Sequence, residues 1–166
     1  DCFDVAYEAV RLSVQHMTPV ILLSDGYIAN GAEPWKFPSA ADLATITVNF
    51  KKELAEDEPK FQPYRRDDKL ARSWAIPGTP GFEHRIGGLE KQDVTGNINY
   101  EPENHQQMVN IRQAKVDKIA DHIPLQTIDS GPEKGKVLVL GWGSTFGAIK
   151  SAVLELQAEG HAVSHA

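Results

Sequence analysis

The chain has 166 residues, a formal net charge of −6 and 41% hydrophobic residues, values typical of a globular protein of one domain or parts of two. The acidic balance argues against a general binder of nucleic acid or anionic membranes, because both favour a basic surface. The single cysteine, Cys2, excludes an internal disulfide framework and a complete iron–sulfur site. No apolar run is long enough to cross a bilayer. The single cysteine also fits a reducing compartment, and we expect a cytoplasmic protein. The first residue is not Met and the last residues read as an unfinished strand, so we expect a fragment of a longer protein.

The first fifty residues predict one helix and two strands. Residues 2–16 have apolar side chains at helical spacing. Residues 19–23 (PVILL) form a continuous apolar run, typical of a strand buried on both faces of a parallel sheet. Glycines and prolines indicate a loop over 26–44, and the alternation over 45–50 predicts an edge strand.

Residues 51–100 are rich in proline, glycine and charge and have little periodicity. A structureless run of this length is unusual inside a compact domain. The neighbourhood nevertheless holds too many large apolar side chains for a plain disordered linker, and we expect this excursion to pack against another surface. These side chains are Trp35, Phe61, Tyr64, Trp74, Ile76 and Phe82.

The last third predicts a parallel strand–helix–strand unit. A long helix is expected over 102–122, with Pro at its first position. A strand over 136–142 leads into a helix near 145–159 that Ser144 would cap, and a further strand opens at 161–164. Such a unit crosses over right-handed and builds a parallel sheet. We therefore predict an α/β fold with an open, mainly parallel sheet flanked by helices in three layers.

Two glycine motifs are candidates for phosphate or metal sites, and both have a simpler interpretation. The loop 141–147 (GWGSTFG) follows a strand and opens a helix, where a phosphate could bind. Its spacing is not that of a dinucleotide or P-loop motif, so a tight turn before a capped helix is favoured. Residues 24–26 (SDG) are similar to the magnesium-diphosphate loop of thiamine enzymes, but too few oxygen ligands follow at the required spacing, and we expect no metal site there.

The histidines and the cysteine are weaker candidates for a metal site or a catalytic nucleophile. His161 and His165 are four residues apart, a spacing suited to a metal only on a helix, and a strand is predicted here. No base accompanies Cys2. More interesting is the loop around His84 and Arg85, which is rich in glycine and proline and could bind an anion or substrate, although an ordered surface loop is the simpler interpretation.

Polar and aromatic residues also follow the predicted strand at 19–23, where parallel sheets usually bind ligands or partners. Packing at an interface is the simpler explanation for them. Together with the loop above, they give a set of candidates for a substrate entrance or an interface, namely Asp25, Asn30, Glu33, Trp35, His84 and Arg85.

Four segments carry a resemblance to a known family. They are TPVILLSDGYIANGAEPW at 18–35, WAIPGTPGFEHRIGGLE at 74–90, the stretch from TGN at 95 to PENH at 105, and GWGST at 141–145. In this order they resemble the α subunit of 2-oxoacid:ferredoxin oxidoreductases, the 2-oxoglutarate type in particular. The resemblance implies that residues 1–38 end a pyrimidine-binding thiamine domain. Residues 39–166, with the loop-rich excursion 51–100, would then begin a transketolase C-terminal-like domain.

The resemblance also implies chemistry for the parent complex. The family decarboxylates a 2-oxoacid oxidatively to an acyl-CoA, with thiamine diphosphate, magnesium and an iron–sulfur cluster as cofactors. Its partners would be the β subunit, ferredoxin and coenzyme A. The family's pyrimidine-contacting Glu and its substrate-recognising Thr and Arg lie upstream of this chain, and the diphosphate loop and cluster cysteines lie on the β subunit or elsewhere. We therefore expect the fragment itself to bind no cofactor, to be inactive alone, and to act as scaffold and interface.

Two alternatives stay open at this point. One is a thiamine-dependent transketolase or 2-oxoacid dehydrogenase subunit, which shares the fold but passes no electrons to ferredoxin. The other is a non-catalytic αβ interaction module whose 51–100 excursion contacts a partner. The acceptor distinguishes the two enzymes, because a low-potential iron–sulfur protein serves one and lipoamide or an aldose serves the other.

Overall fold

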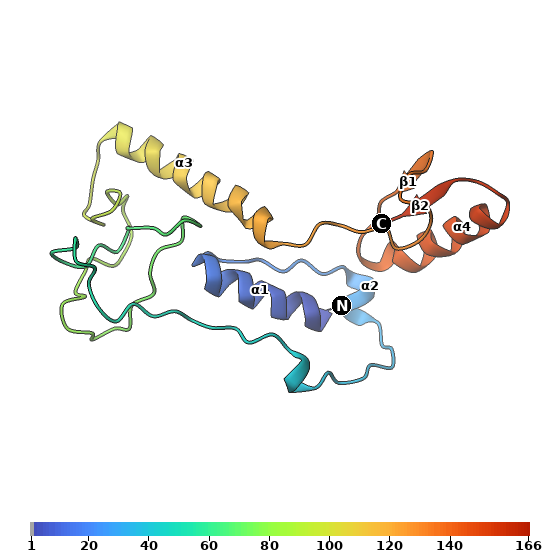
Figure 1. Cartoon of the computed structure of the whole chain (residues 1–166), viewed down its shortest axis with the longest axis horizontal. Helices are drawn as coiled ribbons and strands as arrows, with labels where there is room; N and C mark the ends of the chain where they lie inside the picture. Colours follow the sequence, from blue (N-terminus) through green and yellow to red (C-terminus); the bar gives the residue numbers. More distant parts are fainter. Residues whose placement is uncertain (1) are drawn as a thin grey trace. The chain divides into compact units, whose positions relative to one another are not determined.

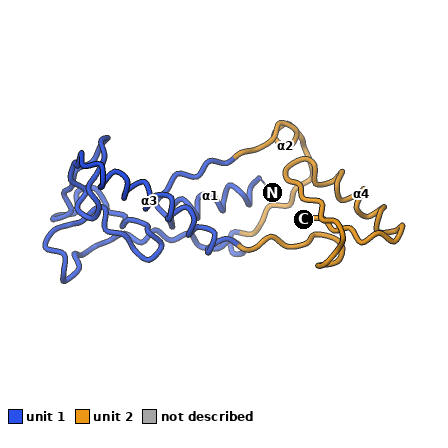
Figure 2. The backbone as a smooth tube through the Cα atoms, turned by 90° about the horizontal axis from the view of Figure 1, so that it is seen from above, with its two compact units in different colours: residues 1–22, 40–123 blue, residues 23–39, 124–166 orange. Residues whose placement is uncertain are grey.

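The structure, a computed structural model, describes residues 2–166, which form two compact units (Figure 2). Unit 1 comprises the residues up to Leu22 together with Ala40–Ile123. Unit 2 comprises Leu23–Ser39 and Pro124–Ala166. Each unit is built from segments that are distant in the sequence, so each is described by itself.

Unit 1 holds two long helices and an extended loop region (Figure 1). Helix α1 spans Cys2–His16 and helix α3 spans Pro102–Ile119, with short 3₁₀ turns η1 at Ala40–Asp42 and η2 at Ala120–His122. Both long helices confirm the predictions from apolar spacing. The predicted proline start of α3 is also confirmed, because proline has no backbone N–H to leave unpaired in the first turn.

Three polar side chains, two from other segments of unit 1 and one from α1 itself, join α1 to its neighbours. The Trp74 indole N–H donates to the Val14 carbonyl at 2.9 Å, and Arg11 of α1 donates to the His122 carbonyl at 3.1 Å. The Lys115 ammonium of α3 donates to the Met17 carbonyl at 3.1 Å. The last carbonyls of a helix have no partner within the helix, so these donors help join the C-terminal end of α1 to α3 and to the loop region.

The loop region 51–100 contains no helix or strand, as predicted, and its order comes from side chains that bond the backbone. The buried Glu58 carboxylate accepts the backbone N–H groups of Ala55 and Gln62 and pairs with Lys51. The Asp67 carboxylate accepts two further N–H groups, from Lys69 and Ala71, both at 2.9 Å. Such bonds replace the ladder of a sheet or helix by satisfying local donors. The aromatic side chains Phe61 and Phe82 stack on each other within this unit, with ring centroids 4.7 Å apart.

Unit 2 contains the predicted parallel strand–helix–strand unit. Strand β1 spans Val137–Val139, helix α4 spans Phe146–Ala158, and strand β2 spans Val163–His165. The strands pair in parallel with Val137 opposite Val163 and Val139 opposite His165. An α/β class with a parallel sheet and flanking helices is therefore confirmed.

Strand β2 is the buried centre of unit 2. All three of its residues are buried, and Val153 of α4, only 1% exposed, lies in the same core. On the side opposite β1, His165 makes an antiparallel bridge to Ser130, donating its N–H to the Ser130 carbonyl at 2.9 Å. Strand β1 is instead largely exposed, because Val137 and Leu138 are 52% and 56% accessible.

Two predicted strands are wrong within the described residues. Residues 19–23 are irregular and exposed rather than buried, and Ile21 is 82% accessible, because no segment of residues 2–166 pairs with them. Residues 45–50 end in a single parallel bridge from Phe50 to Trp74. The bridge does not extend into a ladder, and the partner segment runs into Pro77, which has no N–H to donate.

Two local predictions need smaller corrections. The expected loop over 26–44 contains a five-residue helix, α2 at Gly26–Asn30, and the turn η1. Ser144 does not cap α4 with its side chain. It lies instead in a 3₁₀ turn, η3 at Gly143–Thr145, and its backbone N–H donates to the Asp25 carboxylate. A side chain from elsewhere in unit 2 thus takes the place that the local cap was expected to fill.

No helix among residues 2–166 is long and apolar enough to cross a membrane.

Candidate functional site

Unit 1 contains a cavity of about 670 Å³ beside the loop that carries His84. This volume is within the range of small-molecule sites. Phe61, Trp74 and Phe82 give the cavity an aromatic lining, and Phe61 and Phe82 are each only 5% exposed. The lining comes from the loop region and Met17, all within unit 1. The loop singled out in the sequence is therefore one wall of a real concavity.

His84 is held in one orientation on this wall. Its Nδ1 lies 2.7 Å from the Phe82 carbonyl oxygen, and its ring meets the edge of Phe61 with centroids 5.0 Å apart. A carbonyl can only accept, so Nδ1 carries the proton and Nε2 is the ring nitrogen left for another partner. A histidine fixed in this way can accept a hydrogen bond when neutral and donate one when protonated.

The charged residues of the lining are mainly cationic. Arg72, Arg85 and Lys91 line the cavity with one carboxylate, Glu83. Arg72 stacks over the Tyr64 ring with its guanidinium carbon 4.5 Å from the ring centroid. Within residues 2–166, neither Arg72 nor Arg85 forms an ion pair. Two arginines of the lining therefore have no ion-pair partner among residues 2–166, in a protein whose net charge is negative.

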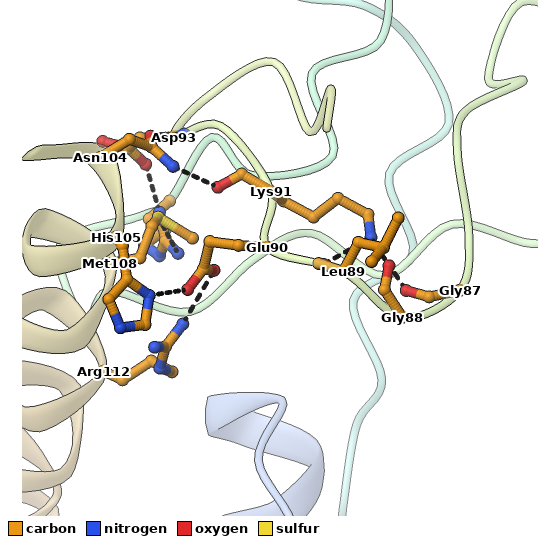
Figure 3. A network of polar contacts seen from close by, with 11 residues as sticks. Gly87, Gly88, Leu89, Glu90, Lys91, Asp93, Asn104, His105, Met108 and Arg112 are labelled. Carbon is orange, nitrogen blue, oxygen red and sulfur yellow. Dashed lines mark hydrogen bonds and ion pairs between the residues drawn. The ribbon is translucent and has the colours of Figure 1, made fainter. Parts of the chain in front are cut away.

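The Lys91 ammonium, by contrast, is hydrogen-bonded to the backbone of the wall itself (Figure 3). Nζ donates to the carbonyls of Gly87, Gly88 and Leu89 at 2.9, 2.5 and 3.0 Å, and the residue is 3% exposed. An ammonium has three protons to donate, so this side chain is fully satisfied by three consecutive carbonyls. Lys91 thus holds the loop closed and has no proton to offer a ligand.

The same loop is anchored to α3 by two carboxylates, and Figure 3 shows the contacts of one of them, Glu90. Glu90 accepts from His105 at 2.7 Å and from Arg112 at 3.3 Å, while Asp93 accepts from Gln107 at 2.9 Å. Burial acts to raise the pKa of Glu90, but the hydrogen bonds from His105 and Arg112 outweigh it and the pKa is lowered. The wall of the cavity is therefore joined to α3 by side-chain hydrogen bonds.

In unit 2, Asp25 has a structural role that the sequence did not reveal. Oδ1 accepts the Ile28 N–H at 2.8 Å and caps α2, and Oδ2 accepts the Ser144 N–H at 2.7 Å. The pKa of Asp25 is lowered by these bonds, that from Ile28 first. Gly143 must stay glycine here, because its φ is +68° and a Cβ would lie 2.4 Å from Oδ2. The loop 141–147 therefore binds a carboxylate of its own chain where a phosphate was considered.

The remaining predicted candidates do not join this cavity. Asn30 donates from its side chain to the Gly26 carbonyl at 2.7 Å within α2, Glu33 is exposed, and Trp35 is 48% exposed with its ring against Phe37. All three belong to unit 2, like Asp25, whereas His84 and Arg85 belong to unit 1.

The described residues do not fit a magnesium–diphosphate group. Both carboxylate oxygens of Asp25, the closest match to a diphosphate loop, are engaged by backbone N–H groups. No group of three or more His, Cys, Asp or Glu side chains within residues 2–166 could hold a metal ion. His165 is fully buried and His161 is exposed, so these two histidines do not form a shared site.

The sequence did not point to Arg72, Trp74 or Lys91 as residues of the site. Arg72 and Trp74 lie in a segment without periodicity, and only the folded chain brings them into the lining of the same cavity as His84. Lys91 had one available signal, the pair Gly87-Gly88 just before it, which permits the tight backbone that presents three carbonyls to one ammonium.

Comparison with known proteins decides the family. The sequence model described as pyruvate flavodoxin/ferredoxin oxidoreductase, thiamine diphosphate-binding, matches residues 1–103. The chain belongs to this oxidoreductase family. The resemblance carried by the four sequence segments is thereby confirmed.

Two relatives within the family are informative. The 2-oxoglutarate oxidoreductase subunit KorA of Mycobacterium tuberculosis is 52% identical over 167 residues, which covers 100% of this chain and 25% of the relative. The α subunit of 2-oxoacid:ferredoxin oxidoreductase 1 of Aeropyrum pernix is 30% identical over 148 residues, covering 87% of this chain and 22% of the relative. The chain therefore spans about a quarter of the length of these family members.

A solved structure agrees with the fold. The 2-oxoglutarate:ferredoxin oxidoreductase of Magnetococcus marinus, determined with 2-oxoglutarate, coenzyme A and succinyl-CoA bound, matches with a TM-score of 0.79 and 27% sequence identity. The match covers 99% of this chain and 28% of that chain. Both units of this family member thus have counterparts in a known oxidoreductase.

Proposed function

We propose that this chain is a section of the α subunit of a 2-oxoglutarate:ferredoxin oxidoreductase. The observation that supports this most strongly is the 52% identity to a 2-oxoglutarate oxidoreductase subunit along the whole chain. In the proposed reaction the C1–C2 bond of 2-oxoglutarate breaks and CO₂ leaves. The remaining acyl group becomes the thioester of coenzyme A, and the two electrons released pass singly to ferredoxin with loss of one proton.

Thiamine diphosphate with magnesium and the iron–sulfur cluster would be held outside this chain, by the rest of the α subunit and by the β subunit. The proposed role of residues 1–38 is to complete a pyrimidine-binding domain, and that of residues 39–166 is to begin a transketolase C-terminal-like domain. Both boundaries stay predictions, as does the cytoplasmic location.

The work of the chain itself is proposed to be scaffolding, with one exception at the cavity. His84 and Arg85 are proposed to form a wall of the substrate entrance, because both line the cavity and Arg85 is unpaired within residues 2–166. Glu33 and Trp35 are proposed as contacts with another subunit, because both side chains are exposed. Asp25 and Asn30 need no such role, since their hydrogen bonds within unit 2 account for them.

The reaction is tested on the full α subunit with its β subunit under anaerobic conditions. Viologen reduction is followed over a panel of 2-oxoacids with and without coenzyme A. Reduction that requires coenzyme A and prefers 2-oxoglutarate supports the proposal. A folded complex that holds its cofactors but reduces only lipoamide, or reduces nothing, contradicts it.

The entrance role has its own test in the same complex. Replacing His84 or Arg85 by alanine removes a hydrogen bond or charge and should lower kcat/KM for 2-oxoglutarate roughly tenfold. Arg65→Ala is the matched control, because Arg65 lies in the same unit but pairs with Asp57. Unchanged KM and kcat in both cavity variants would exclude the entrance role and leave the reaction itself untouched.

A further inference from the structure

A second cavity of unit 1, of about 440 Å³, has a polar lining that comes from three segments. Helix α1 contributes one cation, residues 45–49 contribute hydroxyl and amide groups, and residues 67–74 contribute two further cations. Neither His84 nor Arg85 lines it, although the two cavities share residues 72–74. This polar cavity is therefore distinct from the proposed substrate entrance.

The lining of the polar cavity holds donors without acceptors. The side chains that make no hydrogen bond or ion pair within residues 2–166 are Thr45, Thr47, Asn49, Lys69, Arg72 and Ser73. Lys69 and Arg72 are half-buried cations, and the others are exposed neutral groups that a ligand can reach from solvent. The third cation of the lining, Arg11, is instead paired with Glu8. One small space thus brings together two free cations and several free hydroxyl and amide donors.

The charge beside the polar cavity is positive on balance, although Asp67 also lines it. The fully buried His16 at the end of α1 responds to this charge. Burial lowers the pKa of His16 most, the charges of His122, Lys69 and Arg11 lower it further, and the opposing effect of Asp67 is the smallest. The Asp67 carboxylate also accepts two backbone N–H groups. The positive charge of the lining is therefore left for an anion to neutralise.

We propose that the polar cavity binds a phosphate monoester, with its phosphoryl group on Lys69, Arg72 and the free hydroxyl groups and its carbon portion on Ile46 and Trp74. A phosphoryl group presents three strong acceptor oxygens and pairs well with both guanidinium and ammonium groups. A carboxylate has two oxygens and would leave more of these donors unpaired. The inference does not rest on the proposed function, because this ligand is not a reactant of that reaction.

The apolar part of the lining favours an organic ester over inorganic phosphate. Val14, Ile46 and Trp74 contribute carbon surface to the cavity. The Trp74 indole N–H is already bonded to the Val14 carbonyl, so its ring offers carbon atoms to a ligand. A carbon group gains free energy against such a surface, whereas inorganic phosphate has no carbon to bury. The volume of the cavity is also within the range of sites for small organic molecules.

Lys69 provides a direct readout, because its ammonium is free to react in the empty cavity and covered in the occupied one. The full α subunit with its β subunit is treated with N-hydroxysuccinimidyl acetate, and the acetylation of each lysine is followed by peptide mass spectrometry. Phenyl phosphate is the probe, and inorganic phosphate and benzyl alcohol supply its two parts separately at equal ionic strength. Saturating coenzyme A is present throughout, so that the binding site of this phosphate-bearing reactant is already filled.

The expected result is that phenyl phosphate slows the acetylation of Lys69 roughly tenfold at ten times its dissociation constant. Acetylation of the exposed Lys52 is the internal control and should not change. Inorganic phosphate should protect Lys69 more weakly, and benzyl alcohol should not protect it.

Two variants locate the binding in this cavity by titration calorimetry. Lys69→Gln should raise the dissociation constant of phenyl phosphate at least tenfold, because a charged hydrogen bond is lost, and Thr47→Val should raise it severalfold. Lys52→Gln is the matched control, because it removes an exposed lysine that does not line the cavity. It should bind the probe like the wild type.

Four results would overturn the assignment. Acetylation of Lys69 that phenyl phosphate does not slow shows that no phosphate monoester of this kind binds, and equal protection by inorganic phosphate shows that the cavity selects charge alone. A Lys69 that is never acetylated shows that protein closes the cavity in the complex. An unchanged dissociation constant in Lys69→Gln places the binding elsewhere. The labelling of the wild type keeps the proposal testable even if a variant does not fold.

Discussion

At the scale of single residues, the cavity wall depends on a buried charge that has no counterion among residues 2–166. Lys91 is 3% exposed and donates only to backbone carbonyls. A buried ammonium is tolerated when hydrogen bonds replace its water shell, and three carbonyls do so here. Leu89 accepts a φ of +66°, unusual for a residue with a side chain. The ammonium therefore stabilises a backbone path that the loop would not otherwise favour.

Replacing Lys91 by methionine should destabilise the loop while leaving α3 intact. Methionine keeps most of the side-chain volume but leaves three carbonyls without a donor, so we expect a loss of about 2 to 3 kcal/mol. Trypsin cleavage after the exposed Arg85 should become faster in the variant. Lys52→Met is the control, because Lys52 is exposed. Equal cleavage rates in both variants would show that Lys91 does not hold the loop.

At the scale of elements, the short helix α2 and the turn η3 depend on one shared carboxylate. Asp25 caps α2 through one oxygen and binds the Ser144 N–H through the other. The orphan N–H groups at the start of a helix favour such an acceptor. Because η3 and the first turn of α4 follow each other directly, Asp25 links segment 23–39 to the strand–helix–strand unit.

Asp25→Ala should lower the melting temperature of the chain by a few degrees, whereas Asp25→Asn should lower it less, because asparagine also caps helices. The lowered pKa of Asp25 means that its stabilisation is present above about pH 4, near the unfolded value, and is lost as the pH falls further. Differential scanning calorimetry measures both effects. Glu133→Ala, an exposed acidic position in the same unit, is the control. A larger loss in the Asn variant than in the Ala variant would contradict the capping role.

A second link between elements joins α1 to η2 and is sensitive to pH. His16 ends α1, is fully buried, and lies 5.1 Å from the ring of His122 between centroids. Burial lowers the pKa of His16, and the charges of His122, Lys69 and Arg11 lower it further, against a smaller opposing effect of Asp67. The folded state thus binds the proton less readily than the unfolded state. The contribution of neutral His16 to the free energy of unfolding is therefore fully present above about pH 6.5, near the unfolded value. It is lost as the pH falls from there through the lowered pKa of the folded state.

His16→Phe should remove much of this dependence, because phenylalanine fills similar space and does not titrate. We expect the urea midpoint of the wild-type chain to fall between about pH 7.5 and 5.5, and that of the variant to fall less. His161→Gln changes an exposed histidine and should keep the wild-type slope. A variant with an undiminished slope would assign the pH dependence to other groups.

Also at this scale, the sequence predicted the elements that depend on local signals. Apolar spacing indicated α1 and α3, Pro102 marked the start of α3, and the run at 136–142 with the following helix indicated the parallel pair. The strand expected at 19–23 failed because pairing depends on a neighbour, which apolar composition does not supply. The loop of His84 was found from its composition, whereas Arg72 and Lys91 depend on distant contacts that spacing does not encode.

At the scale of the whole molecule, unit 2 exposes several large apolar side chains. Large side chains there are highly accessible, namely Tyr27 80%, Phe37 82%, Leu125 90%, Leu140 63% and Trp142 85%. Monomeric globular proteins rarely expose many large apolar groups in one small unit, and such surface usually contacts other protein. The chain spans about a quarter of the length of its relatives, and under the proposed function the rest of the α subunit would be available to cover this surface.

If this surface is covered in the full subunit, substitutions in it should affect the stability of the full subunit and not that of the 166-residue chain. One double variant tests this difference. Leu140→Ser with Trp142→Ser should reduce the binding of 8-anilinonaphthalene-1-sulfonate by the 166-residue chain without changing its far-ultraviolet circular dichroism, because both side chains are already in water there. In the full α subunit the same change should cost about 2 to 4 kcal/mol if these side chains are covered. Lys136→Ser, at an exposed neighbouring position, should change neither quantity. A double variant that leaves the full subunit as stable as the wild type would show that the rest of the subunit does not cover this surface.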